Sequence, residues 1–224
     1  MRQFLVIGLG NFGATVAKSL TTRGCQVLAI DISKDIVQEI KDDVTEAIVM
    51  DVRDRDAIKS LPVQASDIAI ICLGDEMEIS ILVTLYLKEM GINKIMVKGT
   101  SEDHAKILKL IGASDIIFPE QEMALRISDR LAYPNVLDLV SLADGFSMAE
   151  LLPLESFFGN SLLDLDIRRQ HGLEIVAIKN TIKDEQGNTT EKIKNIPSGD
   201  YVIDRGDILV VVGEDKYIEK YRRL

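Results

Sequence analysis

The first thirty-one residues constrain the fold of this chain more than any other segment. An apolar run at residues 4–7 leads into three closely spaced glycines, a helical pattern over 14–20 and a second apolar run over 25–30. Short runs without polar residues predict strands that are buried on both faces of a parallel sheet. The segment therefore predicts a strand–loop–helix–strand unit with two parallel strands.

Three glycines, Gly8, Gly10 and Gly13, lie between the first strand and its helix. Gly8 permits the tight turn off the strand, Gly10 lets a phosphate approach the backbone, and Gly13 lets the helix lie close to the strand. The free N–H groups and the dipole of the helix start favour an anion at the same place. The loop therefore predicts a nucleotide site. The alternative is a Rossmann-like fold whose loop binds no ligand.

The second strand stops at Asp31, eighteen residues after Gly13. A carboxylate at this position can accept hydrogen bonds from both ribose hydroxyls and would repel a 2′-phosphate. NADP is therefore disfavoured, whereas NAD, ATP, ADP and AMP all stay open.

Composition limits the classes of partner. The chain has 224 residues and a formal net charge of −10, and no basic cluster interleaved with aromatic residues, so we expect no nucleic acid partner. No apolar run is long enough to span a bilayer, and no secretory leader opens the chain. Cys25 and Cys72 lie in apolar runs and fit no metal spacing, which favours core residues in a reducing cytoplasm.

Strands and helices alternate through the first half of the chain. Gly24, Gly91 and Gly112 are placed to end three of the helices. The alternation predicts a Rossmann-like, doubly wound parallel sheet with helices on both faces. The expected strands are 4–7, 27–30, 47–50, 68–73, 94–97 and 115–118, and the expected helices are 12–22, 34–42, 54–60, 77–90 and 102–111.

The carboxyl ends of these strands form one edge of the sheet, where such folds bind ligands. Asp31 and Asp51 should flank an adenosine there, and Lys98 is the one cation expected at this edge, suited to a phosphate. The alternatives are a helix N-cap or solvated turn for Asp51 and a surface charge for Lys98. The residues at the strand ends are Asp31, Ile32, Ser33, Asp51, Val52, Leu73, Gly74, Asp75, Lys98, Gly99 and Thr100.

The second half of the chain does not continue the alternation of strands and helices. A helix is expected over 119–132, and a break at 133–135 marks the boundary of a small, mostly antiparallel α+β domain. We therefore divide the chain into a nucleotide-binding domain (1–118), a crossover helix and linker (119–134) and a regulatory domain (135–224). Within the last we expect strands at 136–142, 146–154, 174–179, 201–203 and 208–212, helices at 162–170 and 216–222, and a hairpin turn at 186–188.

The sequence contains no catalytic motif that we recognise. His104 falls early in a helix that faces the nucleotide edge, and His171 is expected to cap a helix end. Glu120 is a candidate ligand for Mg²⁺ or Ca²⁺ beside phosphates, or simply an acid at a helix start. A nucleotide site without acid–base chemistry favours a sensor over an enzyme. The rival interpretation is a small NAD-dependent oxidoreductase.

The whole chain resembles the cytosolic regulatory subunits of Ktr/Trk potassium-uptake systems, the RCK (regulator of K⁺ conductance) proteins. The resemblance is carried by the segments 4–13, 27–31, 97–98, 111–120 and 204–213. It implies ATP, ADP or NAD(H) as ligand, assembly into dimers and then rings, usually octameric, and docking on the cytoplasmic face of a membrane potassium-translocating subunit.

The resemblance also assigns roles to residues. The phosphates would meet Gly8, Leu9, Gly10, Asn11, Phe12 and Gly13, and the ribose would meet Asp31. The adenine would lie beside Ile32, Ser33, Asp51 and Val52. Leu73, Gly74, Asp75, Lys98, Gly99, Thr100 and His104 would close the pocket, and Glu120 would help to hold a divalent cation.

Two features of the resemblance bear on the ligand. Many members of the family carry Arg where this chain has Asn11, which weakens the case for discrimination of ATP over ADP and favours NAD or AMP-type ligands. The second domain binds cyclic di-AMP in some members. The matching stretch is 162–171, where Arg168 could meet a phosphate while Leu162 and Leu163 pack on a base. The alternative is a dimer-forming helix with a solvated arginine.

Overall fold

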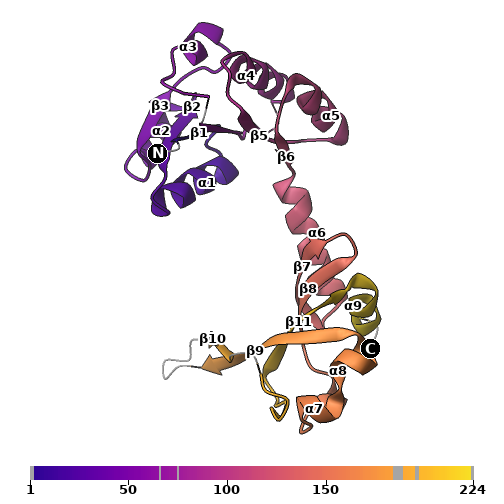
Figure 1. Cartoon of the computed structure of the whole chain (residues 1–224). Helices are drawn as coiled ribbons and strands as arrows, with labels where there is room; N and C mark the ends of the chain where they lie inside the picture. The colour runs from indigo at the N-terminus through magenta and orange to yellow at the C-terminus, as the bar shows by residue number, and fades with distance from the viewer. Residues whose placement is uncertain (1–2, 66, 75, 184–188, 195–196, 223–224) are drawn as a thin grey trace. The chain divides into compact units, whose positions relative to one another are not determined.

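The protein is described here by a computed structural model that covers residues 3–65, 67–74, 76–183, 189–194 and 197–222 (Figure 1). The chain divides into two compact units, Met1–Pro119 and Glu120–Leu224. Within the described residues, no helix has both the length and the apolar composition needed to cross a bilayer.

The first unit contains a six-stranded sheet in which every pair of neighbouring strands is parallel. Its order is β3-β2-β1-β4-β5-β6, so the sequence of strands reverses direction between β1 and β4. This is the doubly wound order, and the predicted fold class is confirmed. The strands are β1 (Gln3–Ile7), β2 (Gln26–Asp31), β3 (Glu46–Val49), β4 (Ile68–Ile71), β5 (Lys94–Lys98) and β6 (Asp115–Ile117).

Helices cover both faces of this sheet because successive strand residues point to opposite sides. Val6 packs in one core with residues of α1 (Asn11–Thr22) and α2 (Lys34–Ile40). Its neighbours Leu5 and Ile7 pack in a second core with residues of α3 (Arg55–Lys59), α4 (Met77–Glu89) and α5 (Glu102–Ile111). The chain crosses from the first face to the second between β3 and α3.

The predicted glycine endings of the helices are confirmed. Gly24, Gly91 and Gly112 follow α1, α4 and α5 with φ of 80°, 85° and 107°, in the left-handed region where a side chain is strained. These glycines let each helix stop and the chain turn into the next strand.

The second unit contains a five-stranded antiparallel sheet in the order β10-β9-β11-β8-β7, which confirms the predicted small α+β domain. Leu151, Leu209 and Ile218 lie in its core. The elements are α6 (Pro119–Ala132), β7 (Val136–Ala143), β8 (Phe146–Leu151), η1 (Glu155–Phe157), α7 (Leu162–Leu165), α8 (Ile167–His171), β9 (Leu173–Lys183), β10 (Thr189–Lys194), β11 (Asp207–Glu214) and α9 (Asp215–Arg222).

Helix α6 clusters with the second unit. Arg126 Nη2 lies 2.9 Å from Asp138 Oδ1 on β7. The guanidinium of Arg222 in α9 lies 4.6 Å from the centre of the Tyr133 ring, and its Nη2 lies 3.6 Å from Asp129 Oδ2. These contacts fix α6 to the antiparallel domain, although none of its residues is buried within the described chain.

Two predicted elements of the second unit are wrong. The single helix expected over 162–170 is two short helices, because Asp166 adopts φ 39° and interrupts it. Residues 201–203 form no strand in the described chain beyond one bridge between Val202 and Ser161. The turn expected at 186–188 lies outside the described residues.

A candidate nucleotide cleft at the strand ends

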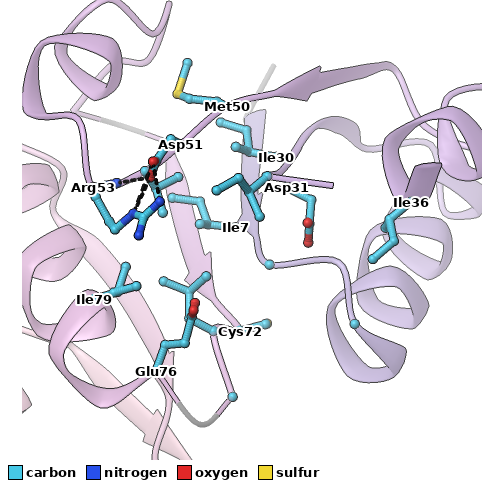
Figure 2. Close-up of a pocket in the computed structure, with 16 residues that line it drawn as sticks. Ile7, Ile30, Asp31, Ile36, Met50, Asp51, Arg53, Cys72, Glu76 and Ile79 are labelled. Carbon is cyan, nitrogen blue, oxygen red and sulfur yellow. Dashed lines mark hydrogen bonds and ion pairs between the residues drawn. The ribbon is translucent and has the colours of Figure 1, made fainter. Parts of the chain in front are cut away.

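A cleft of about 420 Å³ opens at the carboxyl ends of β1, β2, β3 and β4 (Figure 2). This is where the strand order reverses, the usual ligand position in such sheets. Eight of the residues predicted for the site line it: Gly8, Gly10, Asp31, Ile32, Asp51, Val52, Leu73 and Gly74.

The three glycines of the first loop differ in their surroundings. Gly8 has φ +87°, and a Cβ there would lie 2.8 Å from the Cys72 carbonyl oxygen. A Cβ on Gly13 would lie 1.9 Å from the Gly8 carbonyl oxygen, so α1 rests directly on the loop. A Cβ on Gly10 would meet nothing within 4 Å. The backbone at Gly10 is therefore open toward the cleft, as a phosphate contact requires.

The Asp31 carboxylate joins the glycine loop to the end of β2. The Leu9 N–H donates to its Oδ2 at 2.7 Å, and the Ser33 N–H donates to its Oδ1 at 2.8 Å. A carboxylate has about four acceptor positions, so each oxygen can still accept a bond from a ribose hydroxyl. Asp31 therefore shapes the loop and faces the cleft at once.

Asp51, which follows β3, is held by Arg53. The Arg53 Nε lies 2.8 Å from Asp51 Oδ1 and 3.1 Å from Oδ2, and Nη2 lies 2.6 Å from Oδ2. These bonds, with the Arg53 backbone N–H, lower the pKa of the Asp51 carboxyl to about 2, so it stays ionised. The N-cap of α3 is Asp54, which accepts the N–H groups of Asp56 and Ala57, so the N-cap alternative for Asp51 does not hold.

Arg53 also corrects the prediction that Lys98 is the one cation at this edge. Among the described residues that line the cleft, Arg53 is the only Lys or Arg. The sequence carries a signal for it, because Asp51 and Arg53 are two residues apart directly after a strand.

The rest of the cleft wall is mainly apolar. Side chains from β1, β2, α2 and α4 contribute, and Ile32 remains 59% exposed although it lines the cleft. Burial raises the pKa of the Cys72 thiol to about 12, so this cysteine is neutral and unreactive. Lining residues that the sequence analysis missed are Ile7, Ile30, Ile36, Met50, Arg53, Cys72, Glu76 and Ile79.

Several predicted residues do not line the cleft. The Leu9 side chain is buried in the core, and a Cβ on Gly99 would lie 2.6 Å from the Phe118 ring, so this glycine allows close packing. Asp75 lies outside the described residues. The predicted residues that the structure leaves out of the lining are Leu9, Asn11, Phe12, Gly13, Ser33, Lys98, Gly99, Thr100 and His104.

His104 is fully buried between α4 and α5. Its Nε2 lies 2.8 Å from Ser80 Oγ, and its Nδ1 lies 3.0 Å from Thr100 Oγ1 and accepts the Thr100 N–H at 3.3 Å. Because Ser80 Oγ donates to the Met77 carbonyl oxygen, we assign the imidazole proton to Nε2. Burial lowers the pKa of His104, which keeps the ring neutral at physiological pH.

Metal ligation by Glu120 stays a prediction. Glu120 is the second residue of α6. Within the part of the chain that the structure describes, no three His, Cys, Asp or Glu side chains gather to hold an ion.

A second hollow lies in the antiparallel domain. Leu162, Leu163 and Arg168 line it together with Glu174, whose Oε2 lies 3.3 Å from Arg168 Nε. The hollow holds about 300 Å³. It is the place where the sequence predicts cyclic di-AMP, and that assignment stays a prediction.

Comparison with known proteins identifies the family. Residues 4–119 match the TrkA-N domain family, and residues 148–224 match the TrkA-C domain family. Ktr system potassium uptake protein C of Bacillus subtilis (strain 168) is 37% identical over 99% of this chain and 96% of its own length. Ktr system potassium uptake protein A of the same organism is 34% identical over 98% and 95%.

Among solved structures, the GsuK channel bound to NAD matches 96% of this chain and 38% of its own, with a TM-score of 0.61 and 19% identity. At that identity the likeness shows the fold alone. The full-length matches to the Ktr proteins confirm the resemblance seen in the sequence. The chain therefore belongs to the family of Ktr/Trk potassium uptake proteins that combine a TrkA-N domain with a TrkA-C domain.

Proposed function

We propose that this chain is a cytoplasmic regulatory subunit of a potassium-uptake system that binds an adenine nucleotide in the cleft of its first domain. The observation that carries the proposal is the combination of an open Gly10 backbone, the Asp31 carboxylate at the end of β2 and an apolar wall in one cleft. Membership of the Ktr/Trk family supplies the biological setting.

The cleft favours some nucleotides over others. Asp31 accepts two backbone N–H bonds and keeps acceptor positions for the ribose, whereas a 2′-phosphate would meet its negative charge. Asn11 at the start of α1 brings no charge to the loop. NAD(H), AMP, ADP and ATP are therefore the proposed ligands, and NADP is disfavoured. Mg²⁺ or Ca²⁺ beside Glu120 and cyclic di-AMP in the second domain are further proposed ligands.

Binding is proposed to regulate and not to catalyse. His104 is neutral and enclosed, and Cys72 is neutral, so neither offers acid–base or nucleophilic chemistry to the cleft. The free energy of binding would instead bias the arrangement of paired subunits. The proposed assembly is a homodimer that forms a ring, octameric by family resemblance. The ring would dock peripherally on the cytoplasmic side of a membrane potassium-translocating subunit.

Calorimetric titration tests the ligand. Purified protein is titrated with ATP, ADP, AMP, NAD, NADH and NADP, each with and without Mg²⁺, and separately with cyclic di-AMP. We expect at least one of the first five to bind and NADP to bind ~10-fold more weakly than NAD, because of charge repulsion at Asp31. Sustained oxidation of NADH with a carbonyl substrate would replace the regulatory proposal with the oxidoreductase.

Potassium uptake tests the partner. The chain is expressed with and without a Ktr-type membrane subunit in cells that lack their own potassium uptake. We expect uptake to depend on both proteins. A Gly10→Ala variant that supports uptake like wild type at all nucleotide levels would contradict regulation through this cleft.

A further inference from the structure

The Asp51–Arg53 pair forms a planar fork at the mouth of the cleft. Arg53 Nε contacts both carboxylate oxygens at 2.8 and 3.1 Å, and Nη2 contacts Oδ2 at 2.6 Å. The Arg53 backbone N–H donates to Oδ1 at 3.0 Å. These bonds lie along one edge of the guanidinium, so they fix its plane and leave its two faces uncovered by Asp51.

The fork lies away from the glycine loop. Arg53 follows the edge strand β3, whereas the loop follows β1, two strands further into the sheet. Neighbouring strands are about 4.8 Å apart, so the two positions are separated by about 10 Å along the strand ends. Figure 2 shows Arg53 and Asp51 on one side of the cleft and Ile36 on the other, with Ile7 between them.

The surroundings of Arg53 suit a flat apolar ring. Val52, Met50 and Ile79 line the cleft together with Arg53. The charge of the guanidinium is already matched by Asp51, and its Nε–Nη2 edge is occupied. An arginine in this state is a weak partner for a phosphate, but its face can still stack on an aromatic base.

We propose that Arg53 recognises the adenine base by stacking its guanidinium face on the ring, with Asp51 as the residue that sets the plane. The proposal rests on the proposed binding of an adenine nucleotide in this cleft. It assigns the phosphates to the glycine loop and the base to the β3 end, and it makes Arg53 a determinant of affinity for the base that is independent of the number of phosphates.

The test compares Arg53→Ala with wild type in calorimetric titrations with AMP, ADP and ATP. We expect the dissociation constant to rise ~10-fold, and by the same factor for all three ligands, because the lost stacking does not involve phosphate. Arg53→Lys keeps the charge without the plane, so it should lose most of the affinity that Arg53→Ala loses. The matched control is Arg55→Ala, since Arg55 pairs with Glu89 and Tyr86 outside the cleft lining.

The outcomes distinguish the stacking of adenine on Arg53 from the proposed binding of an adenine nucleotide in the cleft. Arg53 has a side chain that is 58% exposed, so its variants should unfold at the wild-type temperature, which a thermal melt checks. A loss of affinity in Arg53→Ala that grows from AMP to ATP would make Arg53 a phosphate ligand and overturn the proposal. Wild-type affinity in Arg53→Ala or in Arg53→Lys would also overturn it. Wild-type protein that binds no adenine nucleotide would overturn the proposed function itself.

Discussion

Glycine-to-alanine substitutions at Gly10 and Gly13 of the glycine loop should have different effects. Gly13→Ala places a Cβ 1.9 Å from the Gly8 carbonyl oxygen, whereas Gly10→Ala places one in open space. Gly10 has φ −61° and ψ −176°, which alanine adopts without strain. We therefore expect Gly13→Ala to impair folding and Gly10→Ala to impair nucleotide binding alone.

The magnitudes follow from the geometry. To reach 3.0 Å, the shortest distance that real Cβ atoms tolerate, α1 and the loop must separate by about 1.1 Å at Gly13. Both contacting groups belong to the backbone, so we take the upper end of the cost of overpacking, about 3 kcal/mol. Alanine recovers about 1 kcal/mol of helix propensity inside α1. The net loss is about 2 kcal/mol, or roughly 8 °C in the unfolding temperature of a unit of this size.

Gly10→Ala should change stability by less than about 1 kcal/mol, because the residue only precedes α1 as its N-cap. Its Cβ would occupy the space through which a phosphate reaches the backbone, and losing those charged hydrogen bonds should weaken binding ~10-fold or more. Scanning calorimetry measures stability, and isothermal titration with ADP measures affinity. Equal changes in the unfolding temperature of Gly13→Ala and Gly10→Ala would refute this account of the loop, and so would wild-type affinity for ADP in Gly10→Ala.

Three further predictions concern other contacts. Asp31→Ala should weaken adenosine ligands by about 2 kcal/mol in the same titration, because charged hydrogen bonds are lost; unchanged affinity would remove Asp31 from the site. Burial lowers the pKa of His104 and of His171 below their ordinary 6.5, so the folded state binds fewer protons than the unfolded state. The stability that each neutral ring contributes should be complete above pH 6.5 and decline as the pH falls below it. The free energy of unfolding, measured with urea, should differ less between pH 7.5 and pH 5.5 in His104→Gln than in wild type. An equal difference in the two proteins would contradict the assignment of this pH dependence to His104. Gly99→Ala should cost about 1–2 kcal/mol through its clash with the Phe118 ring, and Phe118→Leu should recover part of that loss in the double variant.

The parts of the fold that the sequence predicted are those that local patterns specify. Strand β1, the glycine loop and Asp31 follow one another within thirty-one residues, and each has a steric or electrostatic requirement that few residue types meet. The helix break at Asp166 was missed because a non-glycine residue with positive φ gives no such pattern. The spacing of Asp51 and Arg53 is visible in the sequence, but whether the long Arg53 side chain turns back to that carboxylate depends on contacts that the spacing does not specify.

His104 is fully buried, although its place in the chain is close to the end of β5. Its position after β5 predicts a place near the ligand, but a position along the chain does not determine which side of a helix faces the strand ends. The helical period does: His104 and Leu108 are four residues apart on α5, and both are fully buried. Its ring nitrogens bond to Ser80 on α4 and to Thr100 before α5, so the histidine ties the start of α5 to α4, the helix that contributes Ile79 to the cleft. A polar residue on the apolar face of a helix near a ligand site should therefore first be examined as a buried, hydrogen-bonded support for that site, and only then as a contact with the ligand.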